Sequence, residues 1–117
     1  MNNVQIGREA ERKAAEYLSD KGYLILDMNF KFMHMGELDI VARQGSTLVF
    51  VEVRMRRTKQ YGTPEGSLTP KKLRTIRRVA QAWMSRKNYH GRACRFDVVA
   101  IDESSGRCEI RHYENAF

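Results

Sequence analysis

The sequence predicts a single α/β domain, with a central mixed sheet of about five strands flanked by helices in the order α-β-β-β-α-β-β. Two segments, residues 7–20 and 70–86, carry apolar residues every three or four positions, as amphipathic helices do. Five further segments of alternating or continuous apolar residues, separated by turn residues, predict the strands. At 117 residues the chain suits one compact domain and is too short for two ordinary ones, so we predict one domain over residues 1–117.

The first helix is expected over residues 7–20, with Gly22 as its stop signal. Glu11 is its unusual member, because apolar residues follow it at three, four and seven positions and so share its face. Two arrangements remain open for this carboxylate. It points inward, or it lies at the edge of the apolar stripe and either reaches water or pairs with Arg8 or Arg12.

Three strands forming a meander are expected next. The first begins at Tyr23 and continues unevenly to Phe32, and a turn over residues 33–36 follows it. Residues 36–42 and 48–54 form the second and third strands. The turn contains a histidine, His34, which could approach a site beside the second strand but is more often a solvated turn residue.

Four charged residues interrupt the apolar pattern of the second and third strands: Glu37, Asp39, Glu52 and Arg54. Strands of this type bury one or both faces, so ionised groups within them must be paired, bound to a cation, or turned towards a wet cleft. This requirement is the main functional clue in the sequence.

Residues 45–46 suit a two-residue hairpin loop with glycine first, as type II′ turns prefer. Position 44 then pairs with position 47, and the residue numbers of every pair along the two strands add up to 91. In that register Asp39 faces Glu52, and Glu37 faces Arg54 on the same side of the sheet. Opposed carboxylates repel unless something positive lies between them, and oxygen ligands suit Mg²⁺ or Mn²⁺. A three-residue loop would break this arrangement.

The second half of the chain begins with a long loop over residues 55–67, and loops of that length are usually functional or mobile. Its Tyr61 could stack on a base or pack on the domain. Thr69 followed by proline is a strong helix start, and Trp83 lies in the apolar stripe of that helix, which predicts a core position.

The last two strands are expected over residues 94–101 and 107–113, with Asp97 as an inward-pointing candidate in the first of them.

The net charge of +7 is concentrated in one part of the chain. Residues 54–78 hold nine Lys or Arg and one acid, whereas the remaining 92 residues carry a net charge of −1. Such clustering is expected of a protein that binds a phosphate backbone, although a solvated basic helix face is the alternative. The candidate phosphate contacts are Arg56, Arg57, Lys59, Lys71, Lys72, Arg74, Arg77 and Arg78.

Other classes of protein are disfavoured. No apolar run approaches the roughly 20 residues that span a bilayer, and the first residues lack a signal-peptide pattern, so we expect a cytoplasmic protein without a membrane segment. Cys94 and Cys108 are the two cysteines, too few for a zinc site, and we expect them to be reduced, with no disulfide.

With these residues placed, the chain resembles the YraN family of small bacterial proteins. That family belongs to the restriction-endonuclease-like (PD-(D/E)XK) nuclease superfamily and is related to archaeal Holliday-junction resolvases. The segments that carry the resemblance span nearly the whole chain. They are Glu11-x-x-Ala14-x-x-Tyr17-Leu18, Gly22-Tyr23, Asn29-Phe30, Gly36-Glu37-Leu38-Asp39, Val49-Phe50-Val51-Glu52-Val53-Arg54, Tyr61-Gly62, Arg95-Phe96-Asp97-Val98-Val99 and Asn115-Ala116-Phe117.

The resemblance implies a restriction-endonuclease-like core and a catalytic site in which Asp39 and Glu52 bind Mg²⁺ or Mn²⁺. It also implies Glu11 as a further metal ligand and Glu37 as a nearby catalytic group. Arg54 departs from the superfamily signature, which has lysine there. Lysine can orient the attacking water or stabilise the charge that develops on phosphate, whereas arginine stays protonated and can do only the latter.

Three functions follow as hypotheses. The first is a metal-dependent endonuclease-like protein that binds and hydrolyses structured or branched DNA, and junction-cleaving enzymes are usually homodimers because their substrate is two-fold. The second, favoured by Arg54, is a non-catalytic nucleic-acid-binding accessory protein in DNA repair, recombination or uptake. The third is a domain whose charged strand residues form a structural ion cluster.

Overall fold

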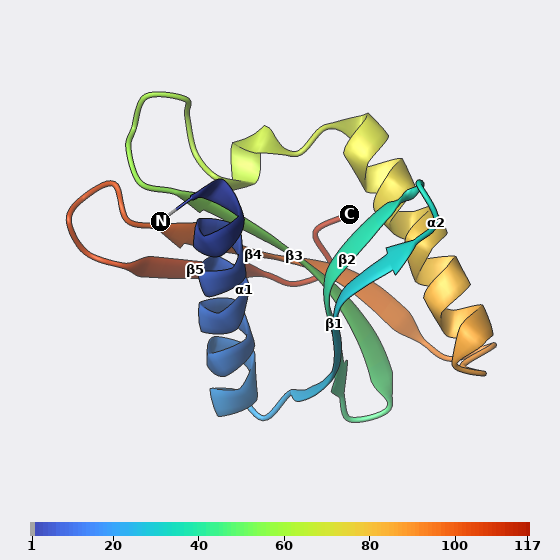
Figure 1. The fold of residues 1–117 in the computed structure, drawn as a ribbon. Helices are drawn as coiled ribbons and strands as arrows, with labels where there is room; N and C mark the ends of the chain where they lie inside the picture. The colour runs from blue at the N-terminus through green and yellow to red at the C-terminus, as the bar shows by residue number, and fades with distance from the viewer. Residues whose placement is uncertain (1) are drawn as a thin grey trace.

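The computed structural model describes residues 2–117, and Figure 1 shows their path. Seven helices and strands follow in the predicted order, with one short 3₁₀ helix, η1, before the second α-helix. Their bounds are α1 Asn3–Asp20, β1 Leu24–Phe32, β2 Gly36–Gln44, β3 Thr47–Arg56, η1 Glu65–Ser67, α2 Pro70–Arg86, β4 Cys94–Asp102 and β5 Glu109–Tyr113.

Both α-helices begin at side-chain caps. Thr69 accepts a hydrogen bond from the backbone of Lys72, so α2 begins at Pro70 as predicted. By contrast, α1 begins at Asn3, four residues before the expected start. Asn2 and Gln5 form a reciprocal capping box there, which lets the helix begin ahead of its apolar stripe.

The five strands form one mixed sheet in the order β1-β2-β3-β4-β5. The first three strands are the predicted antiparallel meander. α2 then carries the chain across the sheet, so β4 runs parallel to β3, and β5 returns antiparallel to β4. The predicted α/β fold class and element order are therefore confirmed.

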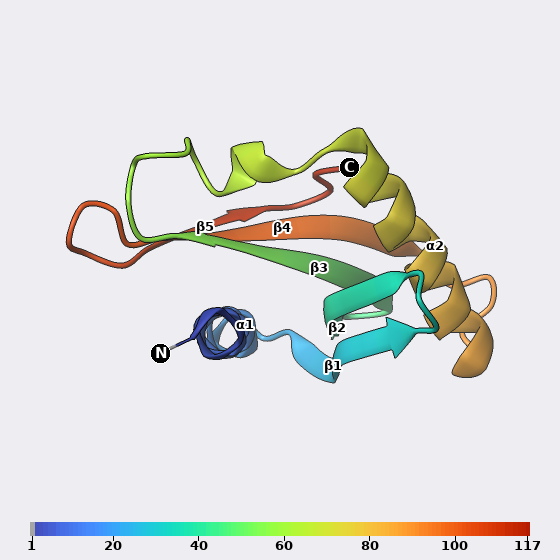
Figure 2. The same ribbon diagram turned by 45° about the horizontal axis from the view of Figure 1, so that its top comes forward.

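One helix covers each face of the sheet. Figures 1 and 2 show α1 and α2 on opposite sides of the strands. The core beneath α1 contains Ala14 and Leu18, and the core beneath α2 contains Ile76 and Trp83. Trp83 is 2% exposed, its ring lies edge-on to Phe50, and its Nε1 donates to Asp27, which confirms the predicted core position.

The predicted register of the β2–β3 hairpin is confirmed near its turn and ends partway along the strands. Pairs sum to 91 from Gln44–Thr47 to Ile40–Val51, where the ladder stops. Beyond that point β2 pairs only with β1. The alternation of β2 also breaks there, because Ile40 packs beneath α1 while Leu38 packs beneath α2. β2 and β3 therefore separate next to Asp39 and Glu52, directly beyond the last ladder pair.

The strand β1 is irregular beside this separation. Its register with β2 shifts between Ile25 and Asp27, and Asn29 has a left-handed backbone with φ of 56°. Bulges and left-handed residues re-aim side chains out of the regular alternation. Here they direct Asn29 towards the carboxylates of α1 and β2.

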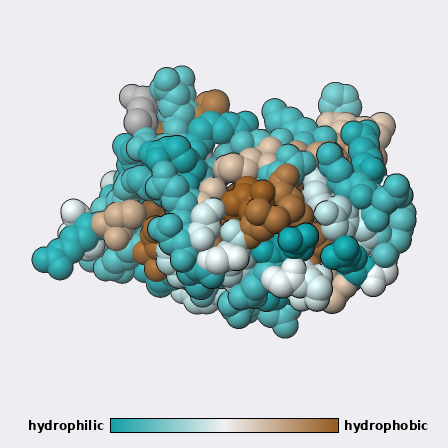
Figure 3. Space-filling view, turned by 90° about the horizontal axis from the view of Figure 1, so that it is seen from below, coloured by the Kyte–Doolittle hydropathy of each residue, from teal (hydrophilic) through white to brown (hydrophobic). Residues whose placement is uncertain are grey.

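The surface is mostly polar. Figure 3 shows a largely hydrophilic face with one hydrophobic area near its centre. Neither helix of the described chain is long and apolar enough to cross a membrane. Cys94 and Cys108 are both exposed and free.

Candidate metal and phosphate site

Three carboxylates converge where β2 leaves β3. Glu11 comes from α1, and Glu37 and Asp39 come from β2. One oxygen from each lies within 4.8 Å of the others, a spacing that could hold a metal ion. Glu11 is 9% exposed and therefore points inward, and it also pairs with Arg8.

Arg8 and Asn29 hold the two glutamates together. Arg8 Nη1 lies 3.0 Å from Oε1 of both Glu11 and Glu37. Asn29 Nδ2 donates to the same two oxygens, at 2.7 and 2.9 Å. Pairing of Glu37 with Arg54, expected from the sequence, is therefore wrong, because the two strands have separated before that point.

The pKa values of the two glutamates shift in opposite directions although both accept from Arg8 and Asn29. Burial acts to raise the pKa of Glu37, but hydrogen bonds from Arg8 and Asn29 hold it below its ordinary value. Glu11 is more deeply buried, and its pKa lies above the ordinary value despite the same two donors.

Asp39 interacts with both Glu11 and Glu52. Burial, followed by the charge of Glu52, raises the pKa of Asp39 to about 7, although Oδ2 accepts a hydrogen bond of 2.9 Å from the Val53 N–H. The two carboxylates are thus close enough to repel, as predicted, but across the separating strands rather than as a ladder pair. Glu52 is 4% exposed.

Arg54 is tied to Glu52, with Nη2 3.1 Å from Oε2. Its Nε is buried and has no hydrogen-bond partner among residues 2–117. A buried donor without a partner is costly, and a phosphate oxygen would satisfy it. Arg54 also lines a cavity of about 370 Å³ together with Glu11, Asp39, Glu52 and Lys72.

The donor set fits a hard divalent ion. Glu11, Glu37 and Asp39 converge and offer only carboxylate oxygens, which Mg²⁺ and Mn²⁺ prefer. Glu52 lines the same cavity as Glu11 and Asp39 but is not one of the three that converge. Burial and then the charge of Glu52 raise the pKa of Asp39, and a bound cation would favour its ionised form.

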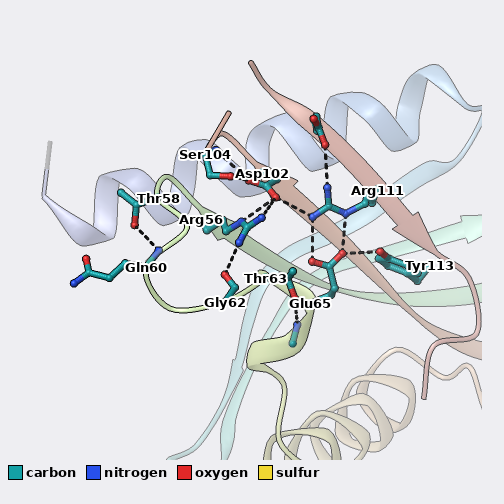
Figure 4. A network of polar contacts seen from close by, with 12 residues as sticks. Arg56, Thr58, Gln60, Gly62, Thr63, Glu65, Asp102, Ser104, Arg111 and Tyr113 are labelled. Carbon is teal, nitrogen blue, oxygen red and sulfur yellow. Dashed lines mark hydrogen bonds and ion pairs between the residues drawn. The ribbon is translucent and has the colours of Figure 1, made fainter. Parts of the chain in front are cut away.

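The basic residues predicted to contact phosphate fall into two groups. Arg56 lies within a polar network, where it pairs with Asp102 at 2.7 Å and donates to the Gly62 carbonyl. In Figure 4 the same network continues through Arg111 to Glu65. It fastens η1 and the preceding loop to β4 and β5.

The other basic residues reach the surface. Arg57 and Lys59 lie exposed on the loop, although Arg57 approaches Glu103 at 3.5 Å. On α2, Lys71, Arg74, Arg77 and Arg78 are exposed, and Lys72 is half-buried. Arg77 lies over the rings of Phe96 and Phe117.

Two expected candidates lie apart from the carboxylates. His34 is exposed in the turn after β1, and Tyr61 is 87% exposed on the loop. Asp97 is fully buried, as predicted, and accepts hydrogen bonds from Arg95 and His112 in a separate network beside α1.

Sequence reasoning missed the role of Asn29 and named Arg8 only as a possible ion-pair partner. The spacing of Arg8 and Glu11 does indicate a helix pair. No local pattern shows that Arg8 also reaches Glu37, or that Asn29 takes a left-handed conformation within a strand.

The profile of the uncharacterised protein family UPF0102 matches residues 10–101. The "UPF0102 protein" of Pelobacter propionicus is 45% identical over 99% of this chain and 84% of its own length. "UPF0102 protein GSU0650" of Geobacter sulfurreducens is 47% identical over 99% and 91%. "UPF0102 protein STH1475" of Symbiobacterium thermophilum is 40% identical over 97% and 96%. This chain belongs to the UPF0102 family, the YraN group that its motifs resemble.

Proposed function

We propose that this protein is a metal-dependent endonuclease-like protein that binds and hydrolyses structured or branched DNA. The observation that carries the proposal is the convergence of Glu11, Glu37 and Asp39 beside Glu52 and Arg54 at the point where β2 and β3 separate. The resemblance to the restriction-endonuclease-like superfamily supports it.

In this proposal Asp39 and Glu52 hold Mg²⁺ or Mn²⁺, with Glu11 as a further ligand. The bound ion would supply Lewis-acid chemistry to a phosphodiester and favour ionised water as the nucleophile. Arg8 and Asn29 keep Glu11 and Glu37 in place by sharing the same two oxygens.

Arg54 contributes positive charge at the reacting phosphate. Its Nη2 is held by Glu52, which leaves the unpartnered Nε to donate to a non-bridging oxygen. Exposed basic residues of the loop and α2 would contact flanking phosphates, which gives affinity without sequence readout. Arg56 would act indirectly, by ordering the loop that carries Lys59.

Cleavage assays test the proposal. We expect the protein to cut branched DNA faster than linear duplex in Mg²⁺ or Mn²⁺, and Asp39→Ala and Glu52→Ala to reduce the rate at least about 100-fold. Glu16→Ala, at an exposed position of α1, is the matched control and should cleave normally. Equal cleavage by wild type and the Asp39→Ala/Glu52→Ala double variant would reveal a contaminating nuclease and refute the proposal.

Arg54 supports a second candidate, a nucleic-acid-binding accessory protein in repair, recombination or uptake that does not hydrolyse its ligand. Arginine in place of lysine preserves the charge that binds phosphate but removes a group that can be deprotonated. The two candidates differ in metal uptake. A binding module should take up no Mn²⁺ at Asp39 and Glu52, yet bind DNA with strong salt dependence.

A further inference from the structure

Lys72 of α2 lines the carboxylate cavity. It lies in the first turn of α2, three residues after the cap Thr69, and lines the same cavity as Asp39, Glu52 and Arg54. Its neighbour Lys71 is exposed and does not line that cavity. Of these two adjacent lysines of α2, Lys72 is therefore the one that belongs to the site.

The position of Lys72 is unfavourable for a cation that serves no purpose there. The first turn of a helix carries partial positive charge, and the first turn of α2 has no acidic residue to offset it. Lys72 is half-buried, and its ammonium forms no ion pair with any residue from 2 to 117. The carboxylates at the same cavity are engaged by other cations, Glu52 by Arg54 and Glu11 by Arg8.

The cavity contains two cationic side chains with different chemical abilities. Arg54 remains protonated and is fixed by Glu52, so it can supply charge but no proton. Lys72 has a single mobile ammonium, which can both contact a phosphate and give up a proton. Of the described residues lining the cavity, Lys72 is the one cation able to do so.

We propose that Lys72 is a catalytic residue that contacts the reacting phosphate and protonates the oxygen that leaves. This inference rests on the proposed nuclease function and adds a residue outside the strand that carries Arg54. In the reaction a water oxygen bonds to phosphorus while the bond to one ester oxygen breaks. The water's proton passes to solvent, the leaving oxygen takes a proton from Lys72 Nζ, and solvent returns a proton to the amine.

Variants at Lys72 separate this role from simple phosphate binding. Lys72→Ala should cut branched DNA about 100- to 10,000-fold more slowly than wild type, the range typical of a lost general acid. Lys72→Arg keeps the charge but releases no proton, so it should cut nearly as slowly while binding DNA like wild type in Ca²⁺. Lys87→Ala, at an exposed lysine outside the charged segment, is the matched control and should cleave at close to the wild-type rate.

A substrate with sulfur in place of the leaving oxygen provides a second readout, because a thiolate leaves without being protonated. On this DNA Lys72→Ala should recover to within about tenfold of wild type. The inference would be overturned if Lys72→Arg cut ordinary DNA at the wild-type rate. It would also be overturned if Lys72→Ala cut the sulfur substrate as slowly, relative to wild type, as it cuts ordinary DNA. If Lys72→Ala cuts normally while Asp39→Ala does not, the inference fails alone. If wild type cuts no DNA, the proposed function fails with it.

Discussion

At the scale of single residues, Asp39 is the most informative side chain. Its pKa of about 7 means that the folded protein keeps a proton there to near neutral pH. An unfolded chain loses that proton near the ordinary value of 3.8. Between these values the native state binds more protons, so the free energy of unfolding of the metal-free protein falls as pH rises.

Asp39→Asn removes this effect, because asparagine resembles the protonated carboxyl. At about pH 8, without metal, we expect the variant to be more stable than wild type by on the order of 2 kcal/mol, and the difference to shrink towards about pH 5. Denaturant unfolding at the two pH values measures it. A stability difference that does not change with pH would show that the fold does not raise the pKa of Asp39.

Asn29 is a second residue whose role can be isolated. Its amide holds Glu11 and Glu37 together while its backbone is left-handed, at φ of 56°. Asn29→Gly keeps that backbone available and deletes only the amide. We expect Mn²⁺ affinity to fall about 10- to 100-fold, as for other groups that orient metal ligands, with little change in stability.

Unchanged Mn²⁺ affinity in Asn29→Gly would mean that the amide does not orient Glu11 and Glu37 for metal binding. Asn29→Ala is the useful comparison, because it also deletes the amide but strains the left-handed backbone by roughly 1 kcal/mol. The two variants should lose the same Mn²⁺ affinity, but Asn29→Ala should be the less stable of the two.

At the residue scale the sequence predicted the carboxylates but not all their partners. Glu11, Asp39 and Glu52 were identified, and the closeness of Asp39 to Glu52 followed from the hairpin register. The pairing of Glu37 was wrong because ideal pairing was extended past the end of the ladder. Strand separation depends on how β2 twists across two helices, which no local pattern encodes.

At the scale of elements, β2 begins in close contact with α2. A Cβ added at Gly36 would lie 2.7 Å from Thr75 Cγ2. Gly36→Ala should therefore destabilise the fold by about 1 to 3 kcal/mol, the usual result of overpacking. This contact matters for the site, because β2 carries Glu37 and Asp39 while α2 carries Lys72.

A double-mutant cycle tests the contact. Thr75→Ser removes the methyl group that the new Cβ would meet, so Gly36→Ala should be at least about 1 kcal/mol less costly in that background. Thermal or denaturant unfolding of the four proteins gives the coupling. Equal costs in both backgrounds would place the strain in the backbone of Gly36 instead.

Elements were predictable where local signals are strong. Thr69-Pro70 placed the start of α2, and the two-residue loop at Gly45 placed the hairpin register. The start of α1 was missed because the capping box at Asn2 lies ahead of the apolar stripe. The network that fastens η1 through Glu65 depends on β5, which is distant in sequence, and was not foreseen (Figure 4).

At the scale of the whole molecule, positive charge is concentrated in residues 54–78 while the rest of the chain is nearly neutral. We therefore expect DNA binding to weaken steeply with salt. In the triple variant Lys71→Ala/Arg74→Ala/Arg78→Ala the slope of log K against log salt should become smaller by about 3. These three residues are exposed on α2, so the fold should not change.

Fluorescence anisotropy over a salt series measures the slope. Arg12→Ala/Lys87→Ala removes two exposed cations that lie outside the charged segment and is the control, with an expected change near zero. A slope unaltered by the triple variant would exclude α2 from the DNA interface.

We propose that the carboxylates where β2 and β3 separate bind a divalent ion. Calorimetric titration of the protein with Mn²⁺ at about pH 8, where Asp39 is mostly ionised, tests it most directly. We expect wild type and the exposed control Glu16→Gln to bind Mn²⁺, and Asp39→Asn to lose that binding. Absence of Mn²⁺ binding by wild type, or equal binding by Asp39→Asn, would contradict the account.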